Sequence, residues 1–512
     1  MDRNDVITSI KYNPDISVLI IGAGINGVGT FRDLTLQGVD TLIIDRADFC
    51  SGASAASSRM AHGGIRYLEN GEFRLVREAV QERNRMIQNA PSLVHPLPTT
   101  IPIFKTFSGL LNAPLKFLGW LEKPSERGGL VIKIGLIFYD AFTGKNRAVP
   151  RHVFDSRPKA LKQFPHLNPG IRYAATYYDG IILSPERLTL ELLLDAEKEG
   201  HHARALNYAS LVEVDGDTVI LHDEVSGLTM TVRPKLIINA AGPWIDGTNT
   251  SLGLSTQYVG PTKGSHLVLD NPELREAIGD HEFFFENKDG RIVLIFPLFD
   301  KVMIGTSDLP IEEPDSARCT EEEVDYFIEM VGRVFPDIKV SREQIVFRFS
   351  GVRPLAYTKA KNAGQITRDH HIQEDKLGNI PVYSLVGGKW TSFRAFSEQA
   401  TDRALAFLGL PRKTDTKSLP IGAGKDAAIL KTDPHYTRGE IAEMALHEKV
   451  VHLDDLLLRR TLLAYLGQLT LPLVEEMANV LGDSLGWDGL RKKAELTRTI
   501  EILADRHQVR FV

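Results

Sequence analysis

A β-strand, a glycine-rich turn, a helix and a second strand follow one another at the start of the chain. The apolar, largely β-branched run at 16–21 is typical of a buried parallel strand, and it leads directly into Gly22-Ala-Gly24-Ile-Asn-Gly27. A helical pattern then extends to residue 36, and a second strand is predicted over 41–44, just before Asp45. This βαβ order predicts an α/β fold whose parallel sheet carries a ligand at the glycine-rich turn.

Each glycine of the turn has a physical role in binding a dinucleotide. Gly22 permits the tight turn, Gly24 lets a pyrophosphate approach the backbone, and Gly27 allows close packing of the helix on the strand. The helix N-terminus offers unpaired N–H groups to the phosphates. Asp45, eighteen residues after Gly27, can accept hydrogen bonds from ribose hydroxyls and would repel a 2′-phosphate, so FAD and NAD remain open while NADP is disfavoured. The residues predicted to hold the dinucleotide here are Gly22, Gly24, Ile25, Asn26, Gly27, Asp45 and Arg46.

Charge and cysteine content limit the classes of partner and compartment. The 512 residues carry 60 basic and 66 acidic side chains, a formal net charge of −6, which lacks the basic excess typical of nucleic-acid binding. Cys50 and Cys319 are too few for a disulfide framework, which favours a reducing compartment. Neither a signal peptide nor an apolar stretch of about 18–20 residues is evident, so a cytoplasmic location is predicted, with peripheral attachment to the inner face of the cytoplasmic membrane as an alternative. We assign no metal ligands.

Patterns further along the chain predict the remaining organisation. Apolar residues at helical spacing indicate an amphipathic helix over 72–90, whereas the prolines between 91 and 102 are expected to break regular structure. Segments 291–296 and 302–304 are predicted hairpin partners, and the composition of 410–435 indicates a linker. Beyond the linker, helical patterns are found over 438–449, 453–466, 470–482 and 488–506.

The βαβ unit and eight further motifs, spread over nearly the whole chain, resemble the FAD-dependent, quinone-linked glycerol-3-phosphate dehydrogenases. Besides the βαβ unit they are Ser54-Ala-Ala-Ser-Ser58, His62-Gly-Gly-Ile-Arg-Tyr-Leu68, Asn239-Ala-Ala-Gly-Pro-Trp244, Lys263-Gly-Ser-His266, Ile304-Gly-Thr-Ser-Asp308, Gly351-Val-Arg-Pro-Leu355, Gly387-Gly-Lys-Trp-Thr391 and Leu458-Arg-Arg-Thr-Leu462. The resemblance implies a D-amino-acid-oxidase type of fold, α/β with a Rossmann-like FAD domain, a sheet-based substrate domain and a helical C-terminal domain. The implied boundaries are 14–95, 171–260 and 345–408 for FAD, 96–170 and 261–344 for the substrate-binding, membrane-facing domain, and 425–512 for the helical domain.

The resemblance also assigns cofactor residues outside the first turn. Ser57, Ser58, Gly63 and Gly64 would approach the pyrophosphate and the isoalloxazine of FAD. Another group would flank the cofactor or close over the flavin, namely Ala241, Gly242, Trp244, Gly388, Lys389, Trp390 and Thr391.

The implied reaction oxidises sn-glycerol 3-phosphate to dihydroxyacetone phosphate and passes the electrons to a quinone. Oxidation of an alcohol needs a base for the hydroxyl proton, and His62 is the candidate, although a structural histidine is the alternative. Arg66, Arg353 and Lys389 are the candidate cations for the phosphate, and Lys389 can instead polarise the flavin or the ketone. Tyr67 is a further candidate hydrogen-bond donor to the substrate.

Two departures from the family leave the substrate open. Segment 181–187 replaces a stretch that usually contains acidic residues, and Ser392-Phe393-Arg394 replaces the usual Thr-Tyr-Arg. If the first segment borders the substrate, a longer polyol phosphate such as an erythritol phosphate becomes the competing substrate. An oxidase that uses dioxygen, an NAD-dependent dehydrogenase and a non-catalytic flavoprotein are three further interpretations of the same residues.

The segment 107–121 is rich in large apolar side chains and has no counterpart in the motifs above. Such a segment can lie in the plane of a membrane surface, which would suit transfer of electrons to a quinone. Packing against the core of the protein or against a second copy of the chain in a homodimer is the alternative. Pro114 would kink any single helix there.

Overall fold

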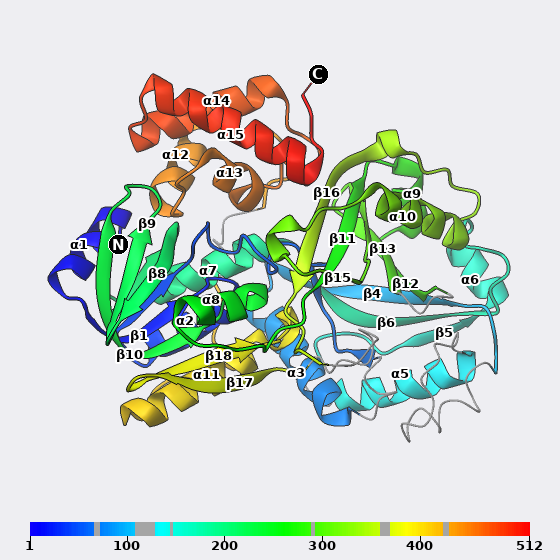
Figure 1. Cartoon of the computed structure of the whole chain (residues 1–512). Coiled ribbons are helices and arrows are strands. Elements are labelled where there is room, and N and C mark those ends of the chain that lie inside the picture. The colour runs from blue at the N-terminus through cyan, green and yellow to red at the C-terminus, as the bar shows by residue number, and fades with distance from the viewer. Residues whose placement is uncertain are drawn as a thin grey trace.

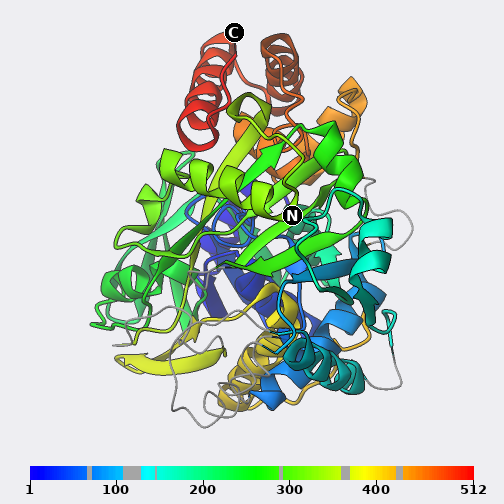
Figure 2. The same ribbon diagram turned by 90° about the vertical axis from the view of Figure 1, so that its right-hand side faces the viewer.

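The computed structural model describes residues 1–65, 72–107, 128–143, 147–287, 292–358, 369–422 and 430–511. Two β-sheets lie side by side, helices cover their outer faces, and the C-terminal helices lie together at one end (Figure 1). The view from the side shows the same C-terminal helices standing above both sheets (Figure 2).

The first sheet contains the predicted βαβ unit. Strand β1 (Asp15–Ile21) lies between β2 (Thr41–Ile44) and β10 (Thr229–Asn239) and runs parallel to both, which confirms the predicted strands and their parallel arrangement. The sheet has the order β17-β18-β10-β1-β2-β7, with β8 and β9 continuing from β10. The other strands are β7 (Ala203–Leu206), β8 (Ala209–Asp215), β9 (Thr218–Asp223), β17 (His371–Leu377) and β18 (Ile380–Val386).

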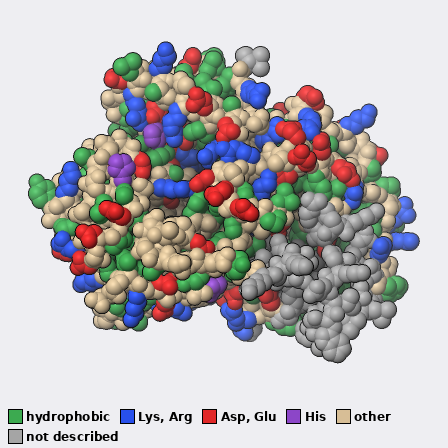
Figure 3. Space-filling view, in the orientation of Figure 1, with side chains coloured by type: hydrophobic (Ala, Val, Ile, Leu, Met, Phe, Trp, Pro, Cys, Tyr) green, Lys and Arg blue, Asp and Glu red, His purple; other side chains and the backbone are tan. Residues whose placement is uncertain are grey.

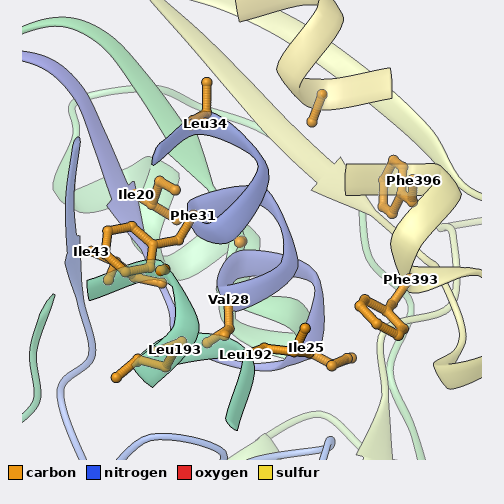
Figure 4. Close-up of a cluster of buried hydrophobic side chains, with 14 of the residues drawn as sticks. Ile20, Ile25, Val28, Phe31, Leu34, Ile43, Leu192, Leu193, Phe393 and Phe396 are labelled. Atoms are coloured by element: carbon orange, nitrogen blue, oxygen red, sulfur yellow. The ribbon is translucent and has the colours of Figure 1, made fainter. Parts of the chain in front are cut away.

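Strand β1 is apolar throughout because both faces of its sheet are covered. Successive side chains point to opposite faces, so Val18 and Ile20 enter the core beneath α2 (Ile25–Leu36), while Leu19 and Ile21 face α1 (Arg3–Tyr12). Figure 4 shows Val28 and Phe31 of α2 among side chains of the sheet, of α7 (Pro185–Glu197) and of α11 (Phe393–Leu408). This packing holds the N-terminus of α2 at the carboxyl edge of the sheet.

The second sheet has the order β15-β11-β14-β13-β12-β4-β6-β3, with β16 added to β11 and β5 to β6. The predicted hairpin is confirmed, because β13 and β14 are antiparallel partners. The strands are β3 (Met60–Ala61), β4 (Val94–Ile103), β5 (Val153–Ser156), β6 (Tyr173–Ile182), β11 (Thr262–Leu269), β12 (Glu282–Glu286), β13 (Ile292–Leu298), β14 (Lys301–Gly305), β15 (Leu309–Pro310) and β16 (Ile345–Arg353). The accompanying helices are α3 (Phe73–Asn89), the predicted amphipathic helix, with α5 (Gly129–Thr143), α6 (Arg157–Gln163), α9 (Pro272–Ile278) and α10 (Glu321–Val334), whereas α8 (Ile245–Ser251) packs on strands β8, β10 and β18 of the first sheet.

The expectation that prolines break regular structure is confirmed at Pro91, which lies in the turn between α3 and β4, but is wrong at the three later prolines. Pro96, Pro98 and Pro102 lie within β4, which pairs with β6 along its whole length. The three prolines occupy alternate positions, so their missing N–H groups all fall on one side of the strand. Residues of the other parity face β6, since the carbonyls of Leu93 and Ile103 accept hydrogen bonds from the ends of that strand.

Residues 173–182 and 345–353, which the sequence-based boundaries place in the FAD domain, form β6 and β16 of the second sheet. Each pairs over its length with a strand of that sheet, β6 with β4 and β16 with β11. Pairing between segments so far apart in the sequence leaves no local signal in either one.

Three of the four predicted C-terminal helices are present as α12 (Arg438–His447), α14 (Leu471–Leu485) and α15 (Gly489–His507). The fourth, predicted over 453–466, is wrong in extent: α13 (Leu453–Asp455) continues only as a π-helical turn (Leu456–Arg460). This widened turn brings Arg459 and Arg460 onto the buried carboxylate of Asp48, at 2.5 and 2.8 Å. Basic and acidic side chains also reach the surface along the boundary between these helices and the sheets (Figure 3).

Candidate active site

A cavity of about 1960 Å³ opens where the two sheets and the C-terminal helices meet. Its walls are the loops that follow β1, β2, β10 and β18 of the first sheet and the inner ends of β11 and β16 of the second. The predicted site residues that line it are Gly22, Gly24, Ile25, Asn26, Asp45, Arg46, Ser57, Ser58, His62, Gly64, Ala241, Gly242, Trp244, Arg353, Gly388, Lys389, Trp390 and Thr391. Gly27 and Gly63 lie behind the wall, and Arg66 and Tyr67 fall outside the described residues.

The glycine turn leaves the start of α2 open to this cavity. Gly22 has a φ of +101°, and a Cβ there would lie 2.7 Å from the carbonyl oxygen of Ala240. A Cβ on Gly27 would lie 1.9 Å from the carbonyl oxygen of Gly22, so only glycine lets the helix approach the turn this closely. Gly24 is the N-cap residue and has no side chain to cover the helix end. The turn therefore fits a pyrophosphate held at a helix N-terminus.

Asp45 is fixed at the end of β2 by two backbone amides. The N–H of Ala23 donates to its carboxylate at 2.7 Å and that of Ala47 at 3.0 Å. Burial raises the pKa of Asp45 to about 6, although both amides favour the carboxylate. The neighbouring Arg46 lies over the ring of Trp244, 4.8 Å from its centre. This edge of the cavity therefore combines a carboxylate for ribose hydroxyls with an aromatic wall.

With FAD as the dinucleotide, as the resemblance implies, we expect the affinity for it to fall in mild acid because of Asp45. The ionised carboxylate is the form that accepts ribose hydroxyls, and its raised pKa of about 6 means that it is lost as the pH falls through that value. Below about pH 6 the FAD dissociation constant should rise by up to about tenfold per pH unit, while above about pH 7 it should be constant. Fluorescence of released FAD, measured at equilibrium across this range, gives the constant. Asp45→Asn should bind more weakly at neutral pH and show a flatter profile; an equally steep profile would assign the titration to another group.

The loop after β18 closes the site against the N-terminal part of the chain. Asn26 donates to the carbonyl of Gly387 at 3.2 Å, and the Trp390 indole donates to the carbonyl of Ser54 at 2.9 Å. The hydroxyl of Thr391 donates to the carbonyl of His62 at 3.0 Å. These bonds bring Lys389 and His62, far apart in the sequence, to the same cavity.

Arg353 ends β16 and faces the cavity from the second sheet. Its guanidinium bonds to Asp308 at 3.1 Å, to the Thr306 hydroxyl at 2.8 Å and to the carbonyl of Ser307 at 3.1 Å. A Cβ on Gly264 would lie 2.2 Å from this guanidinium, so the glycine makes room for it. The side chain remains 24% exposed and is held in one orientation, as a phosphate-binding fork requires.

Sequence reasoning missed the groups that hold Arg353, because no spacing links them to it. The motif containing Thr306 and Asp308 carries a family resemblance but no predicted role, and none is predicted for the C-terminal residues Arg459 and Arg498, which also line the cavity. Without the positions of strands β14 and β16, nothing in the sequence places these groups together.

The segment 181–187 does not border the cavity. The structure describes all of this segment, and none of it lines the cavity. Two of its polar residues instead contact the C-terminal part of the chain: Arg187 pairs with Glu448 at 2.5 Å, and Glu186 accepts from the Tyr465 hydroxyl at 3.0 Å. Phe393, in the second departure, is buried beside α2. Neither departure therefore argues for a different substrate.

Comparison with known families decides the class of the protein. A family model described as FAD dependent oxidoreductase matches residues 17–383, and one described as the C-terminal domain of alpha-glycerophosphate oxidase matches 402–492. The chain belongs to the FAD-dependent oxidoreductases. FAD is therefore its cofactor, which confirms the predicted cofactor and sets aside the NAD alternative.

Individual relatives agree with this family. The chain is 35% identical to a glycerol-3-phosphate dehydrogenase of Synechocystis sp., over 80% of this chain and 74% of that one. It is 30% identical to the D-erythritol 1-phosphate dehydrogenase of Brucella abortus, over 75% and 73% of the two chains. The Synechocystis relative confirms the resemblance to glycerol-3-phosphate dehydrogenases.

A solved structure of similar fold supports the predicted architecture. The glycerol-3-phosphate dehydrogenase from Bacillus halodurans, complexed with FAD, superposes with a TM-score of 0.73 over 98% of this chain and 97% of that chain, at 20% identity. The predicted fold class is confirmed: a mixed α/β protein with an FAD-binding fold of the D-amino-acid-oxidase type and a helical C-terminal part. Within the described ranges, none of the helices is long and apolar enough to cross a membrane.

Proposed function

We propose that the protein oxidises sn-glycerol 3-phosphate to dihydroxyacetone phosphate and passes the electrons through FAD to a quinone. The observation that carries this proposal is a single cavity shared by the dinucleotide turn, His62, Arg353 and Lys389. The family and the relatives support the same reaction. We also propose the sequence-based division of the chain into FAD-binding, substrate-binding and C-terminal helical domains, except that β6 and β16 belong with the second, substrate-binding sheet.

The residues divide the work of alcohol oxidation between them. Arg353 binds the phosphate oxygens through its fixed fork and sets the position of the substrate carbon. His62 removes the proton of the C2 hydroxyl, and Lys389 stabilises the developing ketone oxygen. FAD, when bound, supplies the hydride acceptor. Beyond the described residues, Arg66 is proposed as a further phosphate ligand and Tyr67 as a hydrogen-bond donor to the substrate.

A second substrate remains a candidate because of one relative. The Brucella abortus relative is named for D-erythritol 1-phosphate, which carries the same phosphate on a longer polyol. Arg353 would bind either phosphate, so this cation alone does not choose between the two substrates.

The outer face of α5 supports peripheral contact with a membrane. Leu130, Ile134, Ile137 and Phe138 recur at helical spacing and are 40–53% exposed. This helix begins at Gly129, after the predicted membrane-contacting segment 107–121, which apart from Phe107 lies outside the described residues. Such an apolar face suits the interface of a bilayer, where a quinone is reached; a second copy of the chain in a homodimer would cover it equally well. The inner face of the cytoplasmic membrane is the proposed location.

Turnover with different acceptors tests the proposal. The enzyme should convert glycerol 3-phosphate to dihydroxyacetone phosphate with a soluble quinone analogue, while dioxygen alone should support little turnover. Rapid hydrogen peroxide production with dioxygen would instead make the protein an oxidase. Failure to bind vesicles of anionic lipid would remove the membrane contact while leaving the chemistry intact.

A further inference from the structure

The peptide group between His62 and Gly63 is held from both sides of the cavity. Its carbonyl accepts from Thr391, just after β18 of the first sheet, at 3.0 Å. Its N–H donates to Asp179, on β6 of the second sheet, at 2.9 Å. The C=O and N–H of one trans peptide point in opposite directions, so these two bonds fix the peptide plane between the sheets.

Asp179 is the centre of a buried polar cluster. Arg83 is fully buried, lies 3.5 Å from the Asp179 carboxylate, and donates to the Tyr139 hydroxyl at 2.9 Å. Tyr139, from the inner face of α5, in turn donates to the same carboxylate oxygen that receives Gly63. Burial raises the pKa of Asp179, whereas Arg83 and the hydrogen bonds of Tyr139 and Gly63 favour the ionised form.

Burying these charged and polar groups costs desolvation free energy that apolar side chains would not. A buried ion pair often contributes less to stability than apolar side chains of similar volume, so its retention needs another reason. The contact with the loop is also as close as a backbone permits, because a Cβ on Gly63 would lie 2.1 Å from the Tyr139 hydroxyl. The cluster therefore contacts the loop that carries His62 at the backbone amide of Gly63.

We propose that Asp179, supported by Tyr139 and Arg83, is a positioning residue that fixes the orientation of His62 for proton removal. Thr391 holds the other end of the same peptide. This inference rests on the proposed function, in which His62 is the base. Because a displacement of about 1 Å in a reacting group can cost about 10²-fold in rate, a loosened peptide should slow the reductive half-reaction without weakening substrate binding.

Anaerobic rapid mixing of the FAD-loaded enzyme with glycerol 3-phosphate separates these two effects. Asp179→Asn replaces a charged acceptor by a weaker neutral one, and should lower the limiting rate of flavin reduction by roughly 10- to 100-fold with little change in the substrate dissociation constant. Tyr139→Phe should lower it in the same direction by less. Tyr326→Phe makes the same change on α10, away from the cavity, and should leave the rate unchanged. Wild-type rates in both cluster variants, or a change in substrate binding alone, would overturn the proposal.

Two further measurements test whether the cluster acts through this peptide. The Thr391→Val and Tyr139→Phe changes should be less than additive in the double variant, because both act on one peptide. Hydrogen exchange of the Gly63 amide in the holoenzyme should be faster in both cluster variants, and unchanged protection would directly contradict the proposal that Asp179 and Tyr139 hold this peptide.

If glycerol 3-phosphate and the other polyol phosphates fail to reduce the wild-type flavin, the proposed function fails. The exchange of the Gly63 amide then decides alone whether the cluster holds the peptide. Because Asp179→Asn also leaves the buried Arg83 without its carboxylate, Tyr139→Phe, which removes no charge, carries the test independently of folding.

Discussion

Replacing His62 with alanine is expected to lower the limiting rate of flavin reduction by about 10²- to 10⁴-fold, the usual contribution of a positioned general base. The hydroxyl proton of the substrate would then have to leave to water. The FAD content and the substrate dissociation constant should change little, because His62 is assigned neither to the pyrophosphate nor to the phosphate. Anaerobic rapid mixing gives the rate and the dissociation constant from one concentration series.

His222→Ala is a matched control for this variant. His222 lies on β9, outside the cavity, with 37% of its side chain exposed, so its replacement should leave reduction unchanged. A wild-type rate in His62→Ala would show that His62 only supports the loop through the carbonyl that Thr391 contacts.

Replacing Arg353 with alanine is expected to weaken glycerol 3-phosphate binding by roughly 10- to 150-fold, since hydrogen bonds to a charged group contribute about 1.5–3 kcal/mol. The loss has a second cause: Asp308 would remain in the cavity without the guanidinium that it now contacts at 3.1 Å, and would repel the phosphate. Arg353→Lys should recover part of the affinity, because it keeps the charge but lacks the planar fork.

The dependence of the reduction rate on substrate concentration measures this effect. Reduction by unphosphorylated glycerol, which has no phosphate to bind, should be equally slow in wild type and Arg353→Ala. Arg342→Ala removes an exposed arginine that pairs with Glu321 of α10 outside the cavity, and it should behave as wild type. If Arg353→Ala binds glycerol 3-phosphate as tightly as wild type, phosphate binding would be assigned instead to Lys389 and to residues outside the described ranges.

Local patterns were sufficient for the dinucleotide half of the site. The strand at 15–21, the helix beginning at Ile25 and the three glycines act within one short stretch, so spacing alone predicts their arrangement. The glycine geometry agrees in detail, since Gly22 has a left-handed φ and Gly27 has no space for a Cβ.

Contacts between distant segments could not be predicted in this way. Thr391 reaches His62 across 329 residues, and Arg353 meets Asp308 across 45, and both contacts depend on which strands pair in three dimensions. The prolines of β4 show the same limitation: they disfavour a strand locally but are tolerated because all of them face away from β6. Similarly, the predicted helix over 453–466 is interrupted where Arg459 and Arg460 bind Asp48.

Anaerobic mixing of the FAD-loaded protein with glycerol 3-phosphate tests the central claim most directly. The visible absorbance of the flavin is followed in parallel with D-erythritol 1-phosphate and with unphosphorylated glycerol. The account predicts rapid bleaching by glycerol 3-phosphate, and at most slow bleaching by glycerol. Bleaching by D-erythritol 1-phosphate alone would retain the chemistry and correct the substrate, whereas a flavin that stays oxidised with every polyol phosphate would contradict the proposed function.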